Sequence, residues 1–507
     1  MKDITTLDHF QPLEQLTQIL CDKTQNPNPL FFRVLVAYYF SKVASMMRVD
    51  VETHDRGTIP VNMYAVNLAV SGAGKNMSTS IVEEEVINKF QHVFLEQTFP
   101  LISEESIAKL AIKRAAKKSE DPDEELVRTK KEFIDLGPLA FSFDSATTAA
   151  VKQMRHKLLM AGAGSVNLEL DEAGSNLSGN MDVFTAFLSL YDIGKIKEKL
   201  TKSTADNTRN EPINGRTPTN MMLFGTPSKL LNGSKTEDEF YSLLDTGFAR
   251  RCFFGLSKTG ASSEGLSAEQ IYDLLTDTSA RTFLEDLSDL LGNLAAPKNF
   301  GATIMINKAV SVLLIEYRMY CEERALAFAD HEDIKKAEMN HRYYKTLKLA
   351  GVFAFIDSSP DITEEYLYNA ICLAEESGLA FENILTRERD YVRLAKHIAT
   401  LDSELTHADL VESLPFYTGT ISTKKEMMSL AIAWGYKNNV VIKTVIADGI
   451  EFISGSTLEE TNLDEMKVSF STHVAENYEN ALVPFNELHK LTQAQGYHWV
   501  NHHLRSL

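Results

Sequence analysis

Cysteine is scarce in this sequence, and the few cysteines form no pattern. The 507-residue chain has four, Cys21, Cys252, Cys321 and Cys372, and they are far apart in mostly apolar stretches. Such spacing predicts neither a zinc site nor a disulfide framework. Sparse, unpatterned cysteines are typical of a reducing compartment, so we expect a cytoplasmic protein.

Long apolar runs are missing too. The longest, residues 30–40, is interrupted by Arg33 and is too short to span a bilayer. The N-terminus has no signal-peptide pattern. We therefore expect no membrane contact.

Basic residues are outnumbered, with 51 lysines and arginines against 70 acidic residues and a net charge of −19. A surface of this charge is not suited to nucleic acid as a whole, so any DNA contact has to use a local basic feature. The composition, 44% hydrophobic and 24% charged, is that of a globular protein. Its length predicts about three or four domains.

Residues 63–80 have the layout of a phosphate-binding loop. An apolar segment with strand character runs to Val70, two glycines and a lysine follow, and residues 81–94 have helical periodicity. The glycines allow backbone N–H groups to turn toward a phosphate, and the lysine adds a positive charge. The residues expected to bind the nucleotide are Ser71, Gly72, Ala73, Gly74, Lys75, Asn76 and Met77.

This loop departs from the G-x-x-x-x-G-K-[ST] pattern at two positions. Ala69 replaces the first glycine, and Asn76 stands where a hydroxyl normally binds Mg²⁺. An amide oxygen can also bind Mg²⁺, with Ser78 as another candidate. The alternative interpretation is an ordinary strand-to-helix turn.

A second candidate motif follows about a hundred residues later. Residues 166–170 are apolar with strand character and lead directly into Asp171-Glu172. In an ATPase the aspartate orders Mg²⁺ through water, and the glutamate activates the attacking water as general base. The alternative is a strand that ends in a solvated acidic turn.

Two further features follow in an order that suits an α/β ATPase. A strand at residues 220–225 precedes Thr226, which could sense the γ-phosphate, as could Asn220. Arg250 and Arg251 then precede another apolar strand. They are either a surface pair at a helix C-terminus or an arginine finger for a neighbouring subunit.

Four lysines form the local basic feature. Lys195, Lys197 and Lys199 alternate, so in a strand they share one face, and Lys202 follows them. Residues 210–216 could return as a partner strand. The pattern predicts a nucleic-acid contact, whereas the alternative is a solvated lysine-rich edge.

The order of these features resembles an AAA+ ATPase, and more closely the superfamily 3-like helicase module of phage and plasmid primase-helicases, which is related to minichromosome-maintenance helicases. The resemblance covers about residues 30–385. The segments that support it are Pro60-Val-Asn-Met-Tyr64, Ser71-Gly-Ala-Gly-Lys75, Asp144-Ser-Ala-Thr147, Leu170-Asp-Glu-Ala173, Leu190-Tyr-Asp192, Gly247-Phe-Ala-Arg-Arg251 and Lys348-Leu-Ala-Gly-Val-Phe-Ala354.

The resemblance implies an α/β fold with a P-loop AAA+ core at residues 61–260, preceded by an N-terminal helical collar at 1–60 and followed by a helical lid at 261–388. Within the collar, residues 31–39 read as an amphipathic helix; residues 138–143 read as a core strand and 303–328 as a lid helix. Residues 389–455, three helices and a hairpin, suggest a winged-helix-like domain. Residues 456–507 begin a similar unit that no hairpin completes, as if the chain were cut or the unit small.

The resemblance also implies roles. Lys75, Asp171 and Glu172 would form the hydrolytic core, Arg250 or Arg251 the trans-acting finger, and Arg342 a second sensor, while the lysine strand would line a central pore. The implied function is an ATP- and Mg²⁺-dependent ring, a hexamer, that moves along single-stranded or forked DNA as a replicative helicase. A primase or a polymerase could be its partner, and a phage-encoded protein would act in the host cytoplasm. The alternatives are a helicase loader or origin initiator that does not unwind DNA, and a non-catalytic nucleotide-binding scaffold.

Overall fold

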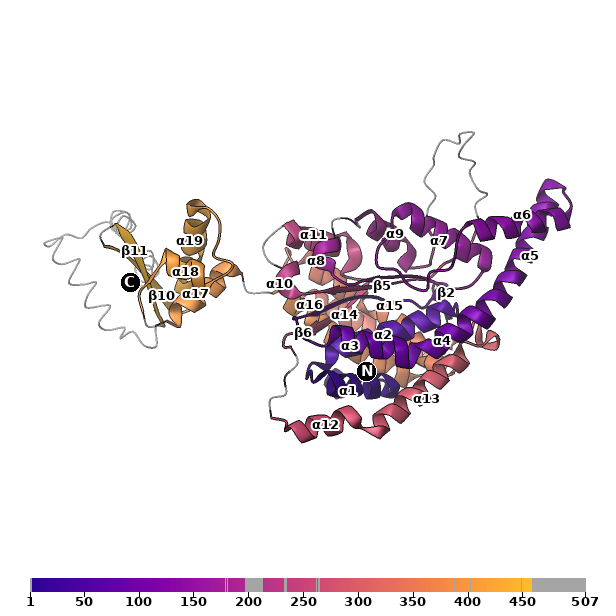
Figure 1. Cartoon of the computed structure of the whole chain (residues 1–507), viewed down its shortest axis with the longest axis horizontal. Coiled ribbons are helices and arrows are strands. Elements are labelled where there is room, and N and C mark those ends of the chain that lie inside the picture. Colours follow the sequence, from indigo (N-terminus) through magenta and orange to yellow (C-terminus); the bar gives the residue numbers. More distant parts are fainter. Residues whose placement is uncertain are drawn as a thin grey trace. The chain divides into compact units, whose positions relative to one another are not determined.

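The computed structural model describes residues 2–177, 179, 181–196, 213–231, 235–260, 262, 265–386, 389–401, 403–447 and 449–457. The chain divides into two compact units, Met1–Leu385 and Thr386–Leu507 (Figure 1). The finer domain boundaries expected at residues 60 and 260 stay predictions. Residues 458–507, nearly all of the expected last unit, lie outside the described residues.

The first unit is a mixed α/β structure around a parallel sheet. The sheet has the strand order β4-β5-β3-β6, and neighbouring strands are parallel throughout. Parallel strands place all their carboxyl ends at one edge, where open α/β sheets bind ligands. The strands are β3 (Tyr64–Ala69), β4 (Val166–Leu170), β5 (Thr219–Gly225) and β6 (Cys252–Ser257).

Helix α2 (Pro29–Met46) lies against one face of this sheet, and α9 (Met181–Tyr191) lies against the other. Side chains alternate along a strand. On β3 the Tyr64 hydroxyl accordingly donates to the Phe187 carbonyl of α9, and Asn67 Nδ2 donates to the Phe31 carbonyl of α2. Because other helices cover its outer side, α2 is buried on nearly all sides rather than amphipathic as expected from its sequence.

Further helices of the first unit lie around the sheet or extend away from it (Figure 1). The segment after β3 is a nearly continuous helix from Lys75 to Lys118 that includes two π-helical stretches, η2 and η3. In chain order the helices are η1 (Ile4–Thr6), α1 (Gln11–Thr24), α3 (Lys75–Ser80), η2 (Ile81–Ile87), α4 (Asn88–Val93), η3 (Phe94–Thr98), α5 (Phe99–Lys118), α6 (Pro122–Asp135), α7 (Thr148–Ala161), α8 (Ala173–Asn176), α10 (Pro227–Leu230), α11 (Lys235–Leu243), η5 (Leu244–Phe248), α12 (Ala268–Thr276), α13 (Thr278–Leu294), η6 (Pro297–Asn299), α14 (Lys308–Ala325), α15 (Asp333–Ile356) and α16 (Glu364–Leu385).

A second sheet of the first unit corrects the helix expected at residues 303–328. Its order is β2-β1-β7-β8, with strands β1 (Asp50–Thr53), β2 (Gly57–Pro60), β7 (Thr303–Ile306) and β8 (Asp361–Ile362). Ile304 and Ile306 are buried while Thr303 and Met305 are exposed, a period-two pattern that favours a strand. Asn307 then caps α14 by accepting a hydrogen bond from Val310 N at 3.0 Å.

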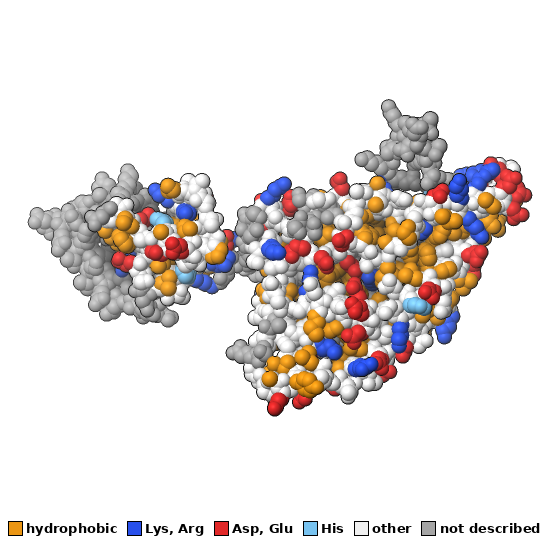
Figure 2. All heavy atoms as spheres, in the orientation of Figure 1, with side chains coloured by type: hydrophobic (Ala, Val, Ile, Leu, Met, Phe, Trp, Pro, Cys, Tyr) orange, Lys and Arg blue, Asp and Glu red, His pale blue; other side chains and the backbone are white. Residues whose placement is uncertain are grey.

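The strand expected at residues 138–143 is reduced to one bridge, between Phe143 and Leu168 at the outer side of β4. The charged region before it forms the helix pair α5–α6, in which Asp121 caps α6. Figure 2 shows basic and acidic side chains gathered together at the tip of this pair. Among the described residues, no helix combines the length and apolar character that crossing a membrane requires.

The second unit has its own small core. A helix, a short strand, two helices and a hairpin follow in that order, and the three strands pair antiparallel in the order β10-β11-β9. The elements are α17 (Asp390–Ala399), β9 (Leu405–Thr406), α18 (His407–Ser413), α19 (Ile421–Lys437), β10 (Val440–Ala447) and β11 (Ile450–Thr457).

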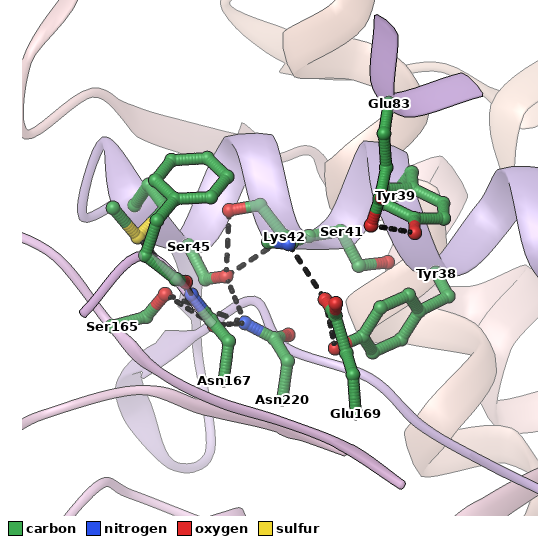
Figure 3. Close-up of polar contacts among 12 residues, drawn as sticks. Tyr38, Tyr39, Ser41, Lys42, Ser45, Glu83, Ser165, Asn167, Glu169 and Asn220 are labelled. Carbon is green, nitrogen blue, oxygen red and sulfur yellow. Dashed lines mark hydrogen bonds and ion pairs between the residues drawn. The ribbon is translucent and has the colours of Figure 1, made fainter. Parts of the chain in front are cut away.

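A cluster of buried polar side chains connects α2 to the main sheet through hydrogen bonds and an ion pair (Figure 3). Lys42 Nζ lies 2.6 Å from Glu169 Oε1 of β4, and these side chains are only 2% and 14% exposed. Tyr38 also donates to Glu169, at 3.0 Å. Asn220 of β5 donates to Ser45 Oγ at 2.6 Å. The cluster therefore sets the position of two strands, including the one that leads into Asp171.

Replacing Lys42 by methionine should lower the free energy of unfolding of the first unit by about 3 kcal/mol, because Glu169 would stay buried without its cation. Denaturant titration, followed by a probe in the first unit, measures the change.

A matched control is available on the surface. Lys89 Nζ and Asp289 Oδ1 are also 2.6 Å apart, but their side chains are 51% and 64% exposed. Lys89→Met should therefore cost less than about 1 kcal/mol. Equal losses for the two variants would contradict a special role for the buried pair.

Candidate nucleotide-binding site

The loop between β3 and α3 has the backbone shape that its sequence predicts. Gly72 and Gly74 have φ values of +81° and +85°, the left-handed region that glycine adopts without strain. Ser78 N bonds to the Gly74 carbonyl, so the helix begins directly after the loop. The first N–H groups of a helix have no partner within it, which leaves those of α3 available to an anion beside the loop.

The N-terminal region supports this loop from behind. Asn26, fully buried, donates from Nδ2 to the Ala73 carbonyl at 2.8 Å and to Ser257 Oγ at 3.1 Å. Thr24, the last residue of α1, packs against Gly74 so closely that a Cβ there would lie 2.6 Å from Thr24 Cβ. Sequence reasoning missed Asn26 and Thr24, because no motif links them to a loop almost fifty residues away.

Lys75 extends from the loop toward the end of β4. Its Nζ donates to the Asp171 carbonyl at 3.0 Å and lies 3.9 Å from Asp171 Oδ1. The same Nζ lies 5.3 Å from the centre of the Phe224 ring of β5. The lysine therefore spans the gap between the loop and the acidic pair.

The two residues of the acidic pair differ in their exposure and in their neighbours. The Asp171 side chain is 81% exposed, whereas that of Glu172 is 31% exposed. Glu172 Oε2 lies 3.6 Å from Nζ of Lys229, on the short helix α10. Lys229 is a third residue that the sequence analysis missed, since nothing in its local sequence marks it.

These residues surround a cavity of about 510 Å³ at the carboxyl edge of the main sheet. All seven expected loop residues line it, together with Asp171, Glu172 and Thr226. Additional lining residues are Asn67, Ala69, Val70, Gly225, Ser228 and Lys229. Three separate sequence segments, residues 67–77, 171–172 and 225–229, thus meet in one place.

The donors available to a metal ion are oxygen atoms. Asn76 and Asp171 are exposed at the cavity, and Mg²⁺ is commonly held by one or two such groups with phosphate oxygens and water. Ser78 does not contribute, because it is fully buried and donates to the Lys75 carbonyl. No group of three or more histidine, cysteine or acidic side chains suited to a metal occurs among the described residues.

The arginine pair lies at the opposite edge of the sheet from the cavity. It immediately precedes β6, whose last residue, Ser257, pairs with Ala69 at the loop. Five residue steps of a strand separate the two edges by about 17 Å. Arg251 forms an ion pair with Asp192 at 3.0 Å, and neither arginine lines the cavity of its own subunit.

Arg342, expected as a second sensor, is not brought to the cavity. Its side chain is 2% exposed, and its guanidinium lies 2.6 Å from Glu338 and 3.0 Å from Glu375. Burial alone would raise the pKa of Glu338, but Arg342 and Lys345 hold that pKa at about 2. Arg342 is therefore part of a buried ion-pair network between α15 and α16.

Of the expected DNA-binding lysines, Lys195 is exposed at the end of the turn after α9. Lys197, Lys199 and Lys202 lie outside the described residues. A scan against models of known protein families and a search of curated proteins each return no match for this chain.

The two loop glycines should differ in their tolerance of alanine. Gly72→Ala would place a Cβ in open space and cost only the strain of a positive φ, about 1–2 kcal/mol. Gly74→Ala carries the same strain and also clashes with Thr24.

We therefore expect a clearly larger fall in Tm for Gly74→Ala than for Gly72→Ala, measured by calorimetry. Similar falls would mean that Thr24 does not support the loop as described.

Proposed function

We propose that the chain is an ATP hydrolase of the AAA+ type. The carrying observation is the cavity in which two left-handed glycines, Lys75 and the Asp171-Glu172 pair converge at the carboxyl edge of a parallel sheet. A lysine and helix N-terminal N–H groups bind phosphate, and a carboxylate pair beside them suits metal binding and water activation.

Each side chain then has a role that its position permits. Lys75 neutralises the β- and γ-phosphates, and Asp171 with Asn76 holds Mg²⁺, whose chemistry is to neutralise charge on the transferring phosphoryl group. Glu172 accepts the proton of the attacking water. Thr226, at the end of the strand between β3 and β4, senses the γ-phosphate.

The active form is a ring, a hexamer. The length of β6 separates the arginine pair from the cavity of its own subunit by about 17 Å. The pair can therefore serve only the site of a neighbouring subunit. Head-to-tail contacts between identical subunits close into rings and place the amino edge of one sheet against the carboxyl edge of the next.

Within this ring the substrate is single-stranded or forked DNA. Lys195 faces the pore and gives an acidic protein a local basic surface. The second unit, with three helices and a hairpin in winged-helix order, contacts nucleic acid or a partner such as a primase or polymerase. The protein is thus a replicative helicase related to those of phages and plasmids; a loader or initiator would use the same site without unwinding.

The site assignment predicts different defects for two variants. Lys75→Ala should weaken ATP binding and abolish hydrolysis, because the phosphates lose their counter-charge. Glu172→Gln should keep ATP binding but stop turnover, because the amide cannot accept the proton. Nucleotide affinity and steady-state ATPase activity measure both effects.

Wild-type hydrolysis rates in both variants would refute the site. Tight ATP binding by the wild-type protein without any turnover would instead identify a scaffold. Turnover that single-stranded DNA stimulates, without unwinding of a forked substrate, would identify a loader or initiator.

A further variant tests the DNA path. Lys195→Ala should leave basal hydrolysis unchanged, reduce DNA stimulation and flatten the salt dependence of DNA binding, because each lysine on a single strand releases roughly 0.7 counter-ion. Lys113→Ala, at an exposed position of α5, is the matched control. Loss of DNA binding only in Lys113→Ala would show that DNA binds to the α5–α6 pair and not at Lys195.

A further inference from the structure

A cluster of charged and polar side chains surrounds the arginine pair at the amino edge of the main sheet. Its centre is Asp192, in the turn that follows α9 and precedes Lys195. Thr217, near the start of β5, closes the base of this turn, since its N–H donates to the Gly194 carbonyl at 2.9 Å.

Asp192 holds Arg251 within its own subunit. Arg251 Nη2 lies 3.0 Å from Asp192 Oδ2, and Nη1 donates to the Gly247 carbonyl at 3.0 Å. The guanidinium also lies 5.7 Å from the centre of the Tyr191 ring. With a side chain only 11% exposed, Arg251 is a fixed support and not a group that reaches outward.

Arg250 packs beside this support. Gly247 has a φ of +117°, and a Cβ there would lie 2.8 Å from Arg251 Nη1 and 3.4 Å from Arg250 Nε. Burial and the charge of Arg251 lower the pKa of Arg250. Within the described part of the chain no carboxylate pairs with Arg250, so its charge remains available to an anion from outside the subunit.

Helix α15 braces the same turn from the other side. Lys348 Nζ donates to the Tyr191 carbonyl at 2.7 Å, and the Tyr344 hydroxyl donates to the Asp192 carbonyl at 3.1 Å. Lys348 also donates to Asn62 Oδ1 at 2.5 Å. The turn that ends at Lys195 is therefore connected by hydrogen bonds both to α15 and to Arg251.

We propose that Asp192 is a positioning residue that holds Arg251, and through it Arg250, in place for the nucleotide of the neighbouring subunit. Arg250 is the arginine that reaches the neighbour's phosphates, and DNA bound at Lys195 acts on hydrolysis through the Asp192–Arg251 contact. This inference rests on the proposed ATPase function and names the residues that link its two sites.

The test is trans-complementation with Asp192→Asn, which keeps the shape of the side chain and removes its charge. The pure variant should bind ATP and DNA as the wild type does, but its hydrolysis rate should fall by about 10- to 100-fold, since small misplacements at a reacting centre cost this much. Its stimulation by single-stranded DNA should disappear. Asp289→Asn, which breaks an exposed ion pair elsewhere, should keep both properties.

Mixing Asp192→Asn with the inactive Glu172→Gln protein should restore hydrolysis. In a randomly mixed ring, about one interface in four combines an intact cavity with an intact arginine pair. A subunit damaged only in its own fold could not be rescued in this way. Absence of rescue, or a wild-type rate and DNA stimulation in pure Asp192→Asn, would overturn the inference.

Two controls keep the test decisive. If Asp192→Asn does not fold, Tyr344→Phe removes one brace of the same turn and should reduce DNA stimulation with ATP affinity unchanged; full stimulation there would overturn the inference. If the wild-type protein hydrolyses no ATP, the proposed ATPase function is wrong. If the wild-type protein is active and Asp192→Asn has the same activity, only the inference about Asp192 is wrong.

Discussion

The burial of one helix against the main sheet is the constraint on which the first unit depends. Because α2 is enclosed on almost every side, each of its polar groups needs a partner inside the protein. Lys42 meets Glu169, and Tyr39 donates to Glu83 in the helix after the loop at 2.6 Å (Figure 3). The same helix is thereby attached to the acidic strand and to the loop helix. The relative position of the two halves of the candidate site follows from these buried bonds.

The parallel direction of the strands separates two kinds of chemistry. The carboxyl edge collects the loop, the acidic pair and Thr226, whereas the amino edge carries the arginine pair and the turn that leads to Lys195. Polar groups at one edge cannot reach the other along a strand of this length. If the arginines act in hydrolysis, a single chain is therefore incomplete, and self-association is a consequence of the sheet's direction.

Sequence patterns predicted the parts of the site that are local. The strand, the glycines and Lys75 are contiguous in sequence, and Asp171-Glu172 directly follows a recognisable strand. Because parallel strands have their carboxyl ends at the same edge of a sheet, the two motifs are expected to lie close together. Contacts between distant segments, such as those of Asn26, left no local signal. Arg342 shows the converse: the family resemblance implied a sensor, but Arg342 forms ion pairs with Glu338 and Glu375 inside the protein. Four residues of β7 were read as helix because they pair only with strands far away in sequence.

The two departures of the loop from the usual pattern have different physical weight. Ala69 belongs to β3 and pairs with Ser257, so its backbone is extended and needs no glycine. The left-handed positions are at Gly72 and Gly74, where glycine is retained. Asn76 is different, because it places an amide oxygen at the cavity where a hydroxyl is usual, and the nearby Ser78 hydroxyl is occupied by a backbone carbonyl. The glycines that the turn requires are thus present. If the cavity binds Mg²⁺ as proposed, a neutral amide and a single aspartate have to suffice as its ligands from the chain.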